Sequence, residues 1–467
     1  MAGPWQPNPS LAARRMFLLL VLLGFGLRMG YGLIRYRSAL KGSGSEFIGK
    51  WDHDALYHVL IAKAVLAGKG YVVDDSPITV ERHLRYAGQD ALFKAPLYQY
   101  FLAGVFAVSG FSFKLFFPLQ ALLGGFSTGL TALISLHVFG RPRAAWLAGG
   151  AAAVQPILVN SASQPYNENL FFFFFLASIW AFLVWLRSER IPWAALSGLM
   201  AGLCMLTRES GELLLVAMGL VVLVARPVTL RRCLGYGVVA AMTLAVVGPW
   251  TVRNYVRTGA FVPVASIVGV DFTEGNNECI ASESIFVPYW SEGPCKLVDQ
   301  QKRAQMELLT FDARVPACVR ADLASRRVAL QFVKDHPLIY ARLVVRRLWT
   351  ALLPFNPRGN QRRTERIVLL LYWLAVFPAG IFGLIFGSTF GSTAGGKRNL
   401  PAFNQPGRML LAVLMLLNLL SIAAVLYWSD LRFLVGIYLL LGCFAGLAYD
   451  ELLDRGRARN GVTAQSG

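Results

Sequence analysis

Long apolar segments dominate this chain, and two polar stretches interrupt them. A hydrocarbon core about 30 Å thick requires roughly 20 mostly apolar residues in each helix that crosses it. Hydrophobic residues make up 55% of the chain, more than in an ordinary soluble domain. The sequence therefore predicts an all-α polytopic membrane protein with about 10–12 transmembrane helices. The predicted spans are 16–34, 96–109, 115–139, 144–160, 169–186, 192–206, 213–225, 233–247, 367–387, 409–428 and 433–449.

The positive charge of the chain indicates an orientation rather than a nucleic-acid partner. The formal net charge is +19, which in a soluble protein would point towards nucleic acid. Here many cations lie in short segments between apolar runs, as the positive-inside rule predicts for cytoplasmic turns. Both termini are therefore predicted inside and both polar stretches outside. The cytoplasmic cations are Arg14, Arg15, Arg187, Arg190, Arg226, Arg231, Arg232, Lys397, Arg398, Arg408, Arg455, Arg457 and Arg459.

This orientation conflicts with the number of predicted spans. Termini on one side require an even number of crossings, whereas the spans given above are odd in number. The surplus lies between Pro96 and Asn160, where Arg141-Pro142-Arg143 predicts a cytoplasmic turn. Either the runs 96–109 and 115–139 do not both cross, or the charge rule fails at Arg141.

The chain is predicted to form a single membrane domain over residues 1–467, without a separate soluble domain. The first apolar run is predicted to be a retained helix, because no small-residue cleavage pattern follows it. The first extracytoplasmic loop, 35–95, is predicted to contain a juxtamembrane helix at 54–67. The second, 251–366, is predicted to contain interfacial helices at 321–333 and 339–353, whose arginines would be costly in mid-membrane. A Gly- and Ser-rich cytoplasmic linker is predicted at 388–408.

The six cysteines divide into two groups. Cys204, Cys233 and Cys443 lie in or at the ends of apolar runs and are predicted to be buried small hydrophobes. The other three fall in the second loop, which would face an oxidising compartment. A bridge between Cys279 and Cys295 is one candidate pairing, and it leaves Cys318 over. No Cys/His spacing resembles a zinc site.

The first loop contains candidate acid–base residues. Asp54 and His58 are four residues apart and share a face of the predicted helix, and Asp52 lies just before it. A carboxylate held at the membrane edge by a short helix is well placed to deprotonate a hydroxyl. The alternative is a pair of solvated surface acids.

Further charged residues lie at predicted helix ends on the same side of the membrane. They are Lys94, Glu168, Arg208, Arg253 and the neighbouring Asn254. Each alone is explained as an interfacial anchor. Together, Arg forks and a Lys point charge suit a phosphate group. A phosphate leaving group needs cations more than a proton donor, so a single acceptor-side base suffices, unlike the two carboxylates of glycoside hydrolases.

A last acid–base pair, Asp430 and Arg432, joins two apolar runs in very few residues. It acts either as a structural clamp on a tight turn or as the far wall of the same site.

Taken in order, these elements resemble the polytopic glycosyltransferases of the C-type (GT-C) fold, over roughly 15–452. The nearest branch is the bacterial one that includes protein mannosyltransferases and lipid A aminoarabinose transferases (family 39-like). The motifs that carry the resemblance are Asp54-Ala55-Leu56-Tyr57-His58, Gly68-Lys69-Gly70-Tyr71, Lys94-Ala95-Pro96-Leu97-Tyr98, Glu168, Gly198-Leu199-Met200-Ala201-Gly202, Leu206-Thr207-Arg208, Pro249-Trp250-Thr251-Val252-Arg253-Asn254-Tyr255, His336-Pro337 and Asp430-Leu431-Arg432-Phe433.

The resemblance implies an inverting transfer of a sugar from a polyprenyl-phosphate donor to an acceptor hydroxyl, which belongs to a protein, a lipid or a glycan. The reaction would take place on the periplasmic face of the bacterial cytoplasmic (inner) membrane. Asp54 maps to the general base, with Asp52 and Glu168 as further catalytic acids. Asp52-His53-Asp54 replaces the adjacent acidic pair of many relatives, which leaves the role of Asp52 open, and Ala95 replaces a proline. The residues predicted to bind the donor phosphate or substrate are Lys94, His58, Arg208, Arg253, Asn254, Tyr98, Asp430 and Arg432.

Other functions remain as alternatives. A secondary transporter would require ionisable residues in mid-helix and inverted repeats, which the sequence does not show. A polysaccharide ligase or polymerase acting on lipid-linked glycans would differ only in its acceptor. No cofactor is predicted to be required. The less favoured alternative is a divalent cation held by acids and the histidine, namely Asp52, Asp54, His58 and Glu168.

Overall fold

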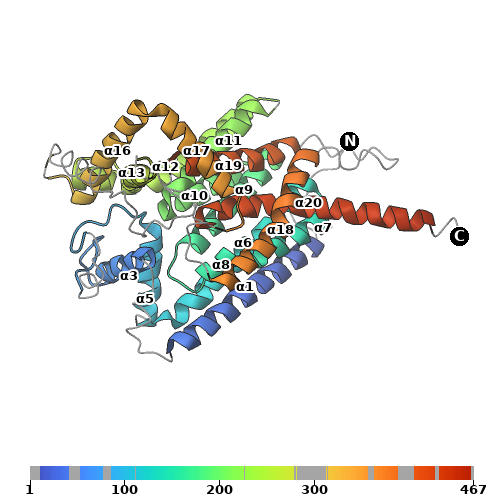
Figure 1. Ribbon diagram of the computed structural model, residues 1–467, viewed down its shortest axis with the longest axis horizontal. Helices are drawn as coiled ribbons and strands as arrows, with labels where there is room; N and C mark the ends of the chain where they lie inside the picture. The colour runs from blue at the N-terminus through green and yellow to red at the C-terminus, as the bar shows by residue number, and fades with distance from the viewer. Residues whose placement is uncertain are drawn as a thin grey trace.

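The computed structural model is built from helices, which confirms the all-α prediction (Figure 1). The structure describes residues 11–40, 53–76, 86–110, 112–225, 227–277, 280, 312, 314–355, 362–387, 404–425 and 431–463. Within these residues the only β-type pairs are two isolated bridges in the first loop. The helices are α1 (Leu11–Leu40), α3 (His53–Leu66), α5 (Leu97–Ser109), α6 (Phe113–Phe139), α7 (Pro142–Ala153), α8 (Pro156–Ser161), α9 (Glu168–Ser188), α10 (Ile191–Thr207), η1 (Glu209–Glu212), α11 (Leu213–Val224), α12 (Leu230–Thr258), α13 (Val268–Gly275), α16 (Ala317–Asp335), α17 (Pro337–Ala351), α18 (Arg363–Phe386), α19 (Asn404–Val425) and α20 (Leu431–Thr463).

Seven helices in the described part of the chain are long and apolar enough to cross a membrane: α1, α6, α9, α12, α18, α19 and α20. The helices α5 and α10 are apolar but shorter. The protein is therefore an all-α polytopic membrane protein, and the total of about 10–12 spans stays a prediction.

The length of α5 bears on the conflict over the number of crossings. Its 13 residues are about 20 Å long, less than the roughly 30 Å hydrocarbon core. It packs against α3 and α6, next to the site described below. This geometry favours the alternative in which 96–109 does not cross, and the cytoplasmic position of Arg141 stays a prediction.

Two predicted spans differ from the helices in the structure. The run 144–160 is broken between α7 and α8, because Pro156 cannot continue a helix and the Gln155 side chain caps the Leu158 N–H at 2.7 Å. In contrast, α12 passes through Pro249 and ends at Thr258, where Gly259 has a φ of 67°. The motif that starts at Pro249 thus lies inside a helix rather than after its end.

The core forms where α9 packs between α6 and α10. Residues 171–175 are five consecutive phenylalanines, of which Phe171, Phe172 and Phe175 are buried in this core. α10 approaches α12 closely through Gly198 and Gly202, where a Cβ would lie 2.3 Å from the Val239 carbonyl oxygen and 2.6 Å from Val246 Cβ. Small residues four apart allow such close helix packing in membranes.

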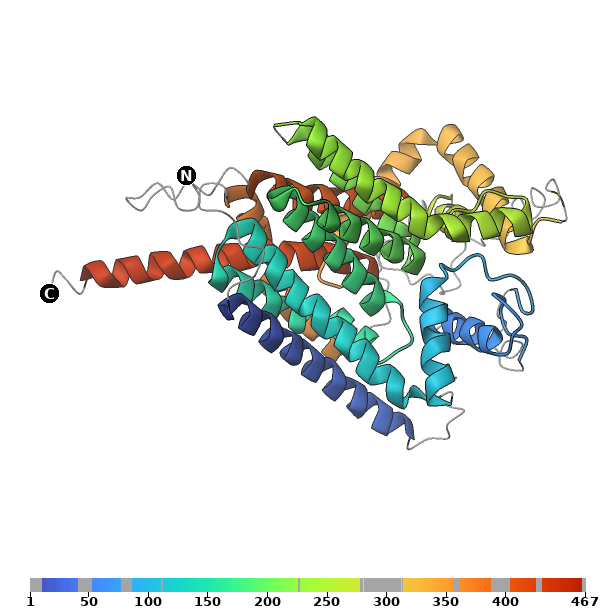
Figure 2. The same cartoon turned by 180° about the vertical axis from the view of Figure 1, so that it is seen from behind.

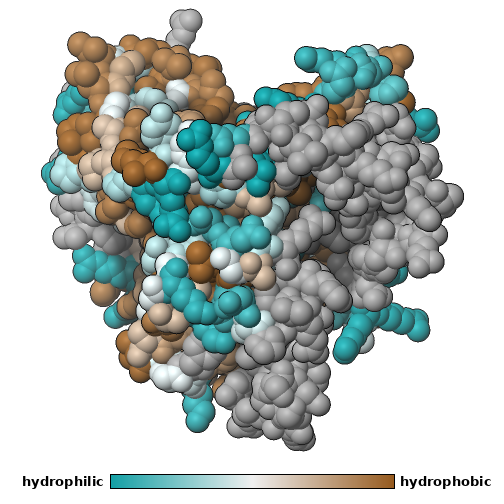
Figure 3. Space-filling view, turned by 90° about the vertical axis from the view of Figure 1, so that its left-hand side faces the viewer, coloured by the Kyte–Doolittle hydropathy of each residue, from teal (hydrophilic) through white to brown (hydrophobic). Residues whose placement is uncertain are grey.

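The polar segments contain short helices at one end of the bundle. α3 closely matches the predicted helix at 54–67, and α16 and α17 match those at 321–333 and 339–353. In both ribbon views α1 runs beside α6, while α3, α13 and α16 lie together at the other end from the chain termini (Figures 1 and 2). We call this the Asp54 end. Hydrophilic side chains gather near the middle of this end, below a hydrophobic area at the upper left of the view (Figure 3).

The cysteine predictions are tested in part. Cys204, Cys318 and Cys443 are buried free thiols, whereas Cys233 is half-buried. Cys279 and Cys295 lie outside the described residues, so their bridge stays a prediction, as does the linker at 388–408, most of which also lies outside.

Candidate active site

Asp54 lies between two cations from distant parts of the chain. It occupies the first turn of α3, where a carboxylate is favoured by the helix dipole. Lys94 Nζ lies 2.6 Å from Asp54 Oδ1, and Arg432 Nη2 lies 3.4 Å from Asp54 Oδ2. Lys94 comes just before α5 and Arg432 lies in the first turn of α20, so Asp54 connects the first loop to the last helix.

The two cations control the protonation of Asp54. Lys94, and after it Arg432, hold the pKa of the Asp54 carboxyl well below its usual range against the opposing effect of burial. Burial lowers the pKa of Lys94, but the Asp54 charge outweighs it and the pKa is raised. Both groups are therefore ionised at neutral pH, and an anion that enters here must compete with Asp54 for the cations.

His58 lies one turn after Asp54 on α3 and is buried. Burial, followed by the Lys94 charge, lowers the pKa of His58 to about 3, so its imidazole is neutral. Its Nδ1 lies 2.8 Å from the Gln99 amide of α5, and its ring packs edge-on against Tyr98 at 4.9 Å. His58 thus fixes α3 against α5, and with them the distance between Asp54 and Lys94.

Two hydrogen bonds and a cation–π contact connect Tyr98 to Arg432. Gln120 of α6 donates to the Tyr98 hydroxyl at 2.6 Å and to the Tyr166 carbonyl at 3.1 Å. The Arg432 guanidinium lies over the Tyr166 ring, 4.9 Å from its centroid. Gln120 is fully buried, so this polar contact fixes where the ring under Arg432 lies.

Glu168 and Arg208 form the neighbouring part of the site. Glu168 begins α9 and is only 2% exposed, with Oε1 3.9 Å from Arg208 Nη1. Arg208 lies directly after α10, and its guanidinium lies 4.4 Å from the centroid of the Phe433 ring. The Asn167 amide donates to the Thr207 carbonyl at 3.1 Å, which holds the ends of α9 and α10 together.

Arg253 and Asn254 take part in packing around the site. Asn254 is fully buried and donates its amide to the Val262 carbonyl at 3.0 Å. The Arg253 guanidinium lies 4.6 Å from the Trp250 ring and 6.0 Å from that of Tyr71. The Tyr71 hydroxyl in turn donates to the Lys94 carbonyl at 2.8 Å.

The structure thus brings together most of the residues singled out in the sequence. Direct contacts or a hydrogen-bonded chain join Asp54, His58, Lys94, Tyr98 and Arg432, and Glu168 and Arg208 lie next to them. Asp52 and Asp430 lie outside the described residues. Among the described residues, no group of three His, Cys, Asp or Glu side chains is arranged to hold a metal ion.

One acid that lies near the site was not indicated by the sequence. Asp271 lies on α13 in the second loop, and burial raises its pKa to about 8, with the charges of Glu274 and Glu209 adding to the effect. Lys94 and Asp54 are close enough to influence it. Asp271 belongs to no motif, so only the packing of α13 indicates its place.

Part of the chain is similar to a known family, and its fold is similar to that of solved structures. Residues 93–252 match a family model described as dolichyl-phosphate-mannose-protein mannosyltransferase. The matched segment includes Lys94, Tyr98, Glu168 and Arg208 but ends before Arg432. A search of curated proteins finds no match to the chain.

Among solved structures, the archaeal oligosaccharyltransferase AglB from Archaeoglobus fulgidus, in complex with an inhibitory peptide and a dolichol-phosphate, has a TM-score of 0.53 at 14% identity. The match covers 98% of this chain and 52% of AglB, so the chain spans about half the length of that protein. The apo form of the same oligosaccharyltransferase gives 0.53 at 14% identity, over 97% of this chain and 52% of the other.

ArnT from Cupriavidus metallidurans, bound to undecaprenyl phosphate, has a TM-score of 0.40 at 16% identity, over 89% of this chain and 75% of ArnT. This score is too low to support an argument. The match to AglB shows that this integral membrane protein has the GT-C fold.

Proposed function

We propose that this protein is a glycosyltransferase that moves a sugar from a polyprenyl-phosphate donor to an acceptor hydroxyl. The observation that carries the proposal is the Asp54 carboxylate, held between Lys94 and Arg432 at one end of a GT-C fold. The site is proposed to face the periplasm from the bacterial cytoplasmic membrane, where long polyprenyl chains lie in the bilayer.

The cations are suited to the phosphate of such a donor. Lys94 supplies a point charge, and Arg432 and Arg208 supply planar forks that match phosphate oxygens. The rings of Tyr166 and Phe433 lie against the two guanidinium groups and restrict their positions. The AglB structure in complex with a dolichol-phosphate supports a lipid of this class as the carrier.

Asp54 is a weak base while it is paired with both cations, because its pKa lies far below neutral. A donor phosphate that takes over Lys94 and Arg432 removes the main cause of that low pKa. Asp54 then becomes a stronger base next to the bound donor. This coupling predicts that the base is activated by donor binding, so that the acceptor is deprotonated only when a sugar is in place.

The transfer is a single displacement. The acceptor oxygen attacks the anomeric carbon from the side opposite the phosphate, and its proton passes to an oxygen of Asp54. The bond between the anomeric carbon and the phosphate oxygen breaks, and polyprenyl phosphate departs with the electron pair. Lys94, Arg432 and Arg208 stabilise the charge that develops on the departing oxygen. One displacement inverts the anomeric configuration.

The proposal is tested with purified protein in liposomes that contain a radiolabelled undecaprenyl-phosphate sugar and a mixture of protein, lipid and glycan acceptors. We expect label to leave the lipid carrier with wild-type protein. Arg432→Gln should weaken donor use about tenfold, as expected for the loss of one charge-assisted contact.

Arg257→Gln is the matched control, since Arg257 also pairs with an acid, Asp90 at 2.8 Å, but outside the site. Wild-type protein that consumes no lipid-linked sugar, whatever the acceptor, would overturn the proposal. Movement of a solute across the bilayer under those conditions would point to a transporter instead.

A further inference from the structure

A pocket lined by apolar side chains, two arginines and a histidine lies at the end of the bundle opposite the Asp54 end. Four helix ends surround it: the C-terminal ends of α6 and α9 and the N-terminal ends of α12 and α19. Glu168 and Arg187 lie at opposite ends of α9, 19 residues and so about 28 Å apart. This separation is close to the thickness of the hydrocarbon core, so the pocket is remote from the site of sugar transfer.

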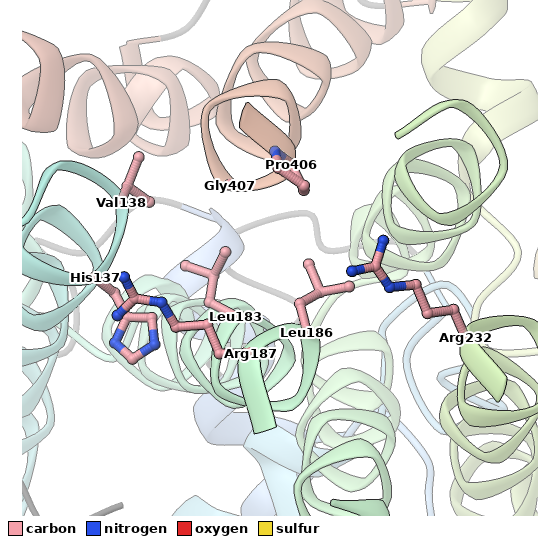
Figure 4. A pocket seen from close by; sticks show the side chains of 8 residues that line it. All are labelled: His137, Val138, Leu183, Leu186, Arg187, Arg232, Pro406 and Gly407. Carbon is pink, nitrogen blue, oxygen red and sulfur yellow. The ribbon is translucent and has the colours of Figure 1, made fainter. Parts of the chain in front are cut away.

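Arginines face this pocket from two sides. Arg187 lies beside His137 on one side, and Arg232 reaches in from the other (Figure 4). Leu183 and Leu186 lie between them. None of the residues that line the pocket is acidic. The nearby Glu189 is 3.7 Å from Arg232 Nε but also 3.2 Å from Arg231 Nη1, so one carboxylate is shared by two arginines.

The start of α19 adds to the positive potential. This helix of 22 residues begins at Asn404, and Pro406 and Gly407 of its first turn line the pocket. The unpaired N–H groups of a helix N-terminus favour an anion. A Cβ on Gly407 would lie 3.2 Å from Val138 Cγ2, so glycine allows this turn to approach α6 closely.

Orientation in the membrane explains why cations lie at this end but not why Arg232 is buried. Arg232 is only 8% exposed, and its Nη1 donates to the Pro227 carbonyl at 3.0 Å. Arg231, the preceding residue, has a side chain that is 71% exposed. A cation that serves only as a topology signal would remain in water as Arg231 does, because burial of a charge without a full partner costs free energy.

We propose that this pocket binds a phosphate group, held by Arg187, Arg232 and the N-terminal turn of α19. Its empty volume of about 340 Å³ includes space open to solvent, so a phosphate group can reach the arginines from outside the helix ends rather than from an enclosed cavity. Its position at the helix ends suits the phosphodiester headgroup of an anionic phospholipid in the leaflet opposite the Asp54 end. Soluble phosphate shares the chemistry, and the experiment distinguishes the two sources.

The test uses the purified full chain in a neutral detergent, stripped of lipid. Binding is measured by native mass spectrometry and by the shift in Tm on titration with phosphatidylglycerol, phosphatidylethanolamine or inorganic phosphate at constant ionic strength. We expect phosphatidylglycerol to bind and raise Tm more than phosphatidylethanolamine. In the double variant Arg187→Gln/Arg232→Gln we expect affinity for phosphatidylglycerol to fall at least about tenfold.

The matched control is Arg190→Gln/Arg231→Gln, which removes the same charge from exposed positions at the same helix ends. It should bind as wild type does. Equal weakening in both double variants would overturn the proposal, because net charge would then explain the binding. If inorganic phosphate alone raises Tm and the pocket variant abolishes that shift, the phosphate site stands with a soluble ligand. The proposal is also overturned if wild-type protein neither prefers phosphatidylglycerol to phosphatidylethanolamine nor gains Tm with inorganic phosphate. This result does not depend on whether the pocket variant folds.

Discussion

Replacing Asp54 with asparagine tests both roles that the structure gives this carboxylate. The amide keeps the shape of the side chain, but it cannot accept the acceptor proton and carries no charge to pair with Lys94 and Arg432. The two losses act on different kinetic constants. Loss of the base lowers kcat. Loss of the ion pairs removes the competitor of the donor phosphate and lowers the donor KM.

The magnitudes follow from the role and the exposure of Asp54. A general base contributes roughly 10²- to 10⁴-fold, so we expect kcat to fall by about that factor. The Asp54 side chain is 45% exposed, so solvent screens its two ion pairs. Exposed pairs are worth about 0.2–1 kcal/mol each, and two of them correspond to roughly a 2- to 30-fold tighter donor complex when Asp54 no longer competes.

The assay measures transfer from a labelled polyprenyl-phosphate sugar in proteoliposomes, with the donor concentration varied at saturating acceptor. Single-turnover measurements separate the chemical step from product release. Asp75→Asn is the matched control, since Asp75 is an exposed first-loop acid that pairs with Lys69 at 2.9 Å, outside the site. We expect it to leave both constants unchanged.

A kcat within a factor of ten of wild type would refute the assignment of Asp54 as the base. A donor KM that rises in Asp54→Asn, with kcat unchanged, would mean that the carboxylate orients the two cations for the donor instead of competing with it.

Three further predictions concern pH and packing. If donor binding takes the cations from Asp54, the acid limb of kcat should lie at higher pH than that of kcat/KM, and coincident limbs would contradict this coupling. The pKa of His58 is 6.5 in an unfolded chain and about 3 when buried, so the unfolded state binds an extra proton between these pH values. Tm should therefore fall as the pH drops from 6.5 towards 3, and it should fall less steeply in His58→Gln. Gly235→Ala would place a Cβ 2.2 Å from Trp185 Cζ2 and should lower stability by about 1–3 kcal/mol, whereas Gly237→Ala, with no heavy atom within 4 Å, should leave Tm almost unchanged.

Much of the candidate site could be predicted because its residues lie next to local signals. Asp54 and His58 are one turn apart on a helix that apolar periodicity reveals, and α3 is found where that pattern places it. Lys94, Glu168 and Arg208 each stand where an apolar run begins or ends. A charged residue at such a boundary is visible without any knowledge of the fold.

The contacts between these residues were harder to predict. Asp54 and Arg432 are separated by 378 positions, and the sequence left open whether Arg432 forms a local clamp with Asp430 or faces the site. The structure shows the contact with Asp54. Asp271 gave no signal, because an acid in a polar loop is unremarkable until the packing of α13 against α16 places it near Lys94 and Asp54.

The sequence by itself determined that this is a helical membrane protein and where most of its helices lie. In a bilayer each backbone N–H and C=O must be satisfied within its own helix, so a span depends only on its own residues. Tertiary packing decided which helix ends meet around Asp54. Lipid is as apolar as the helix surfaces, so the hydrophobic pattern does not select which helices pack together. Close fits such as Gly198 against Val239, and paired charges between distant segments, select the partners.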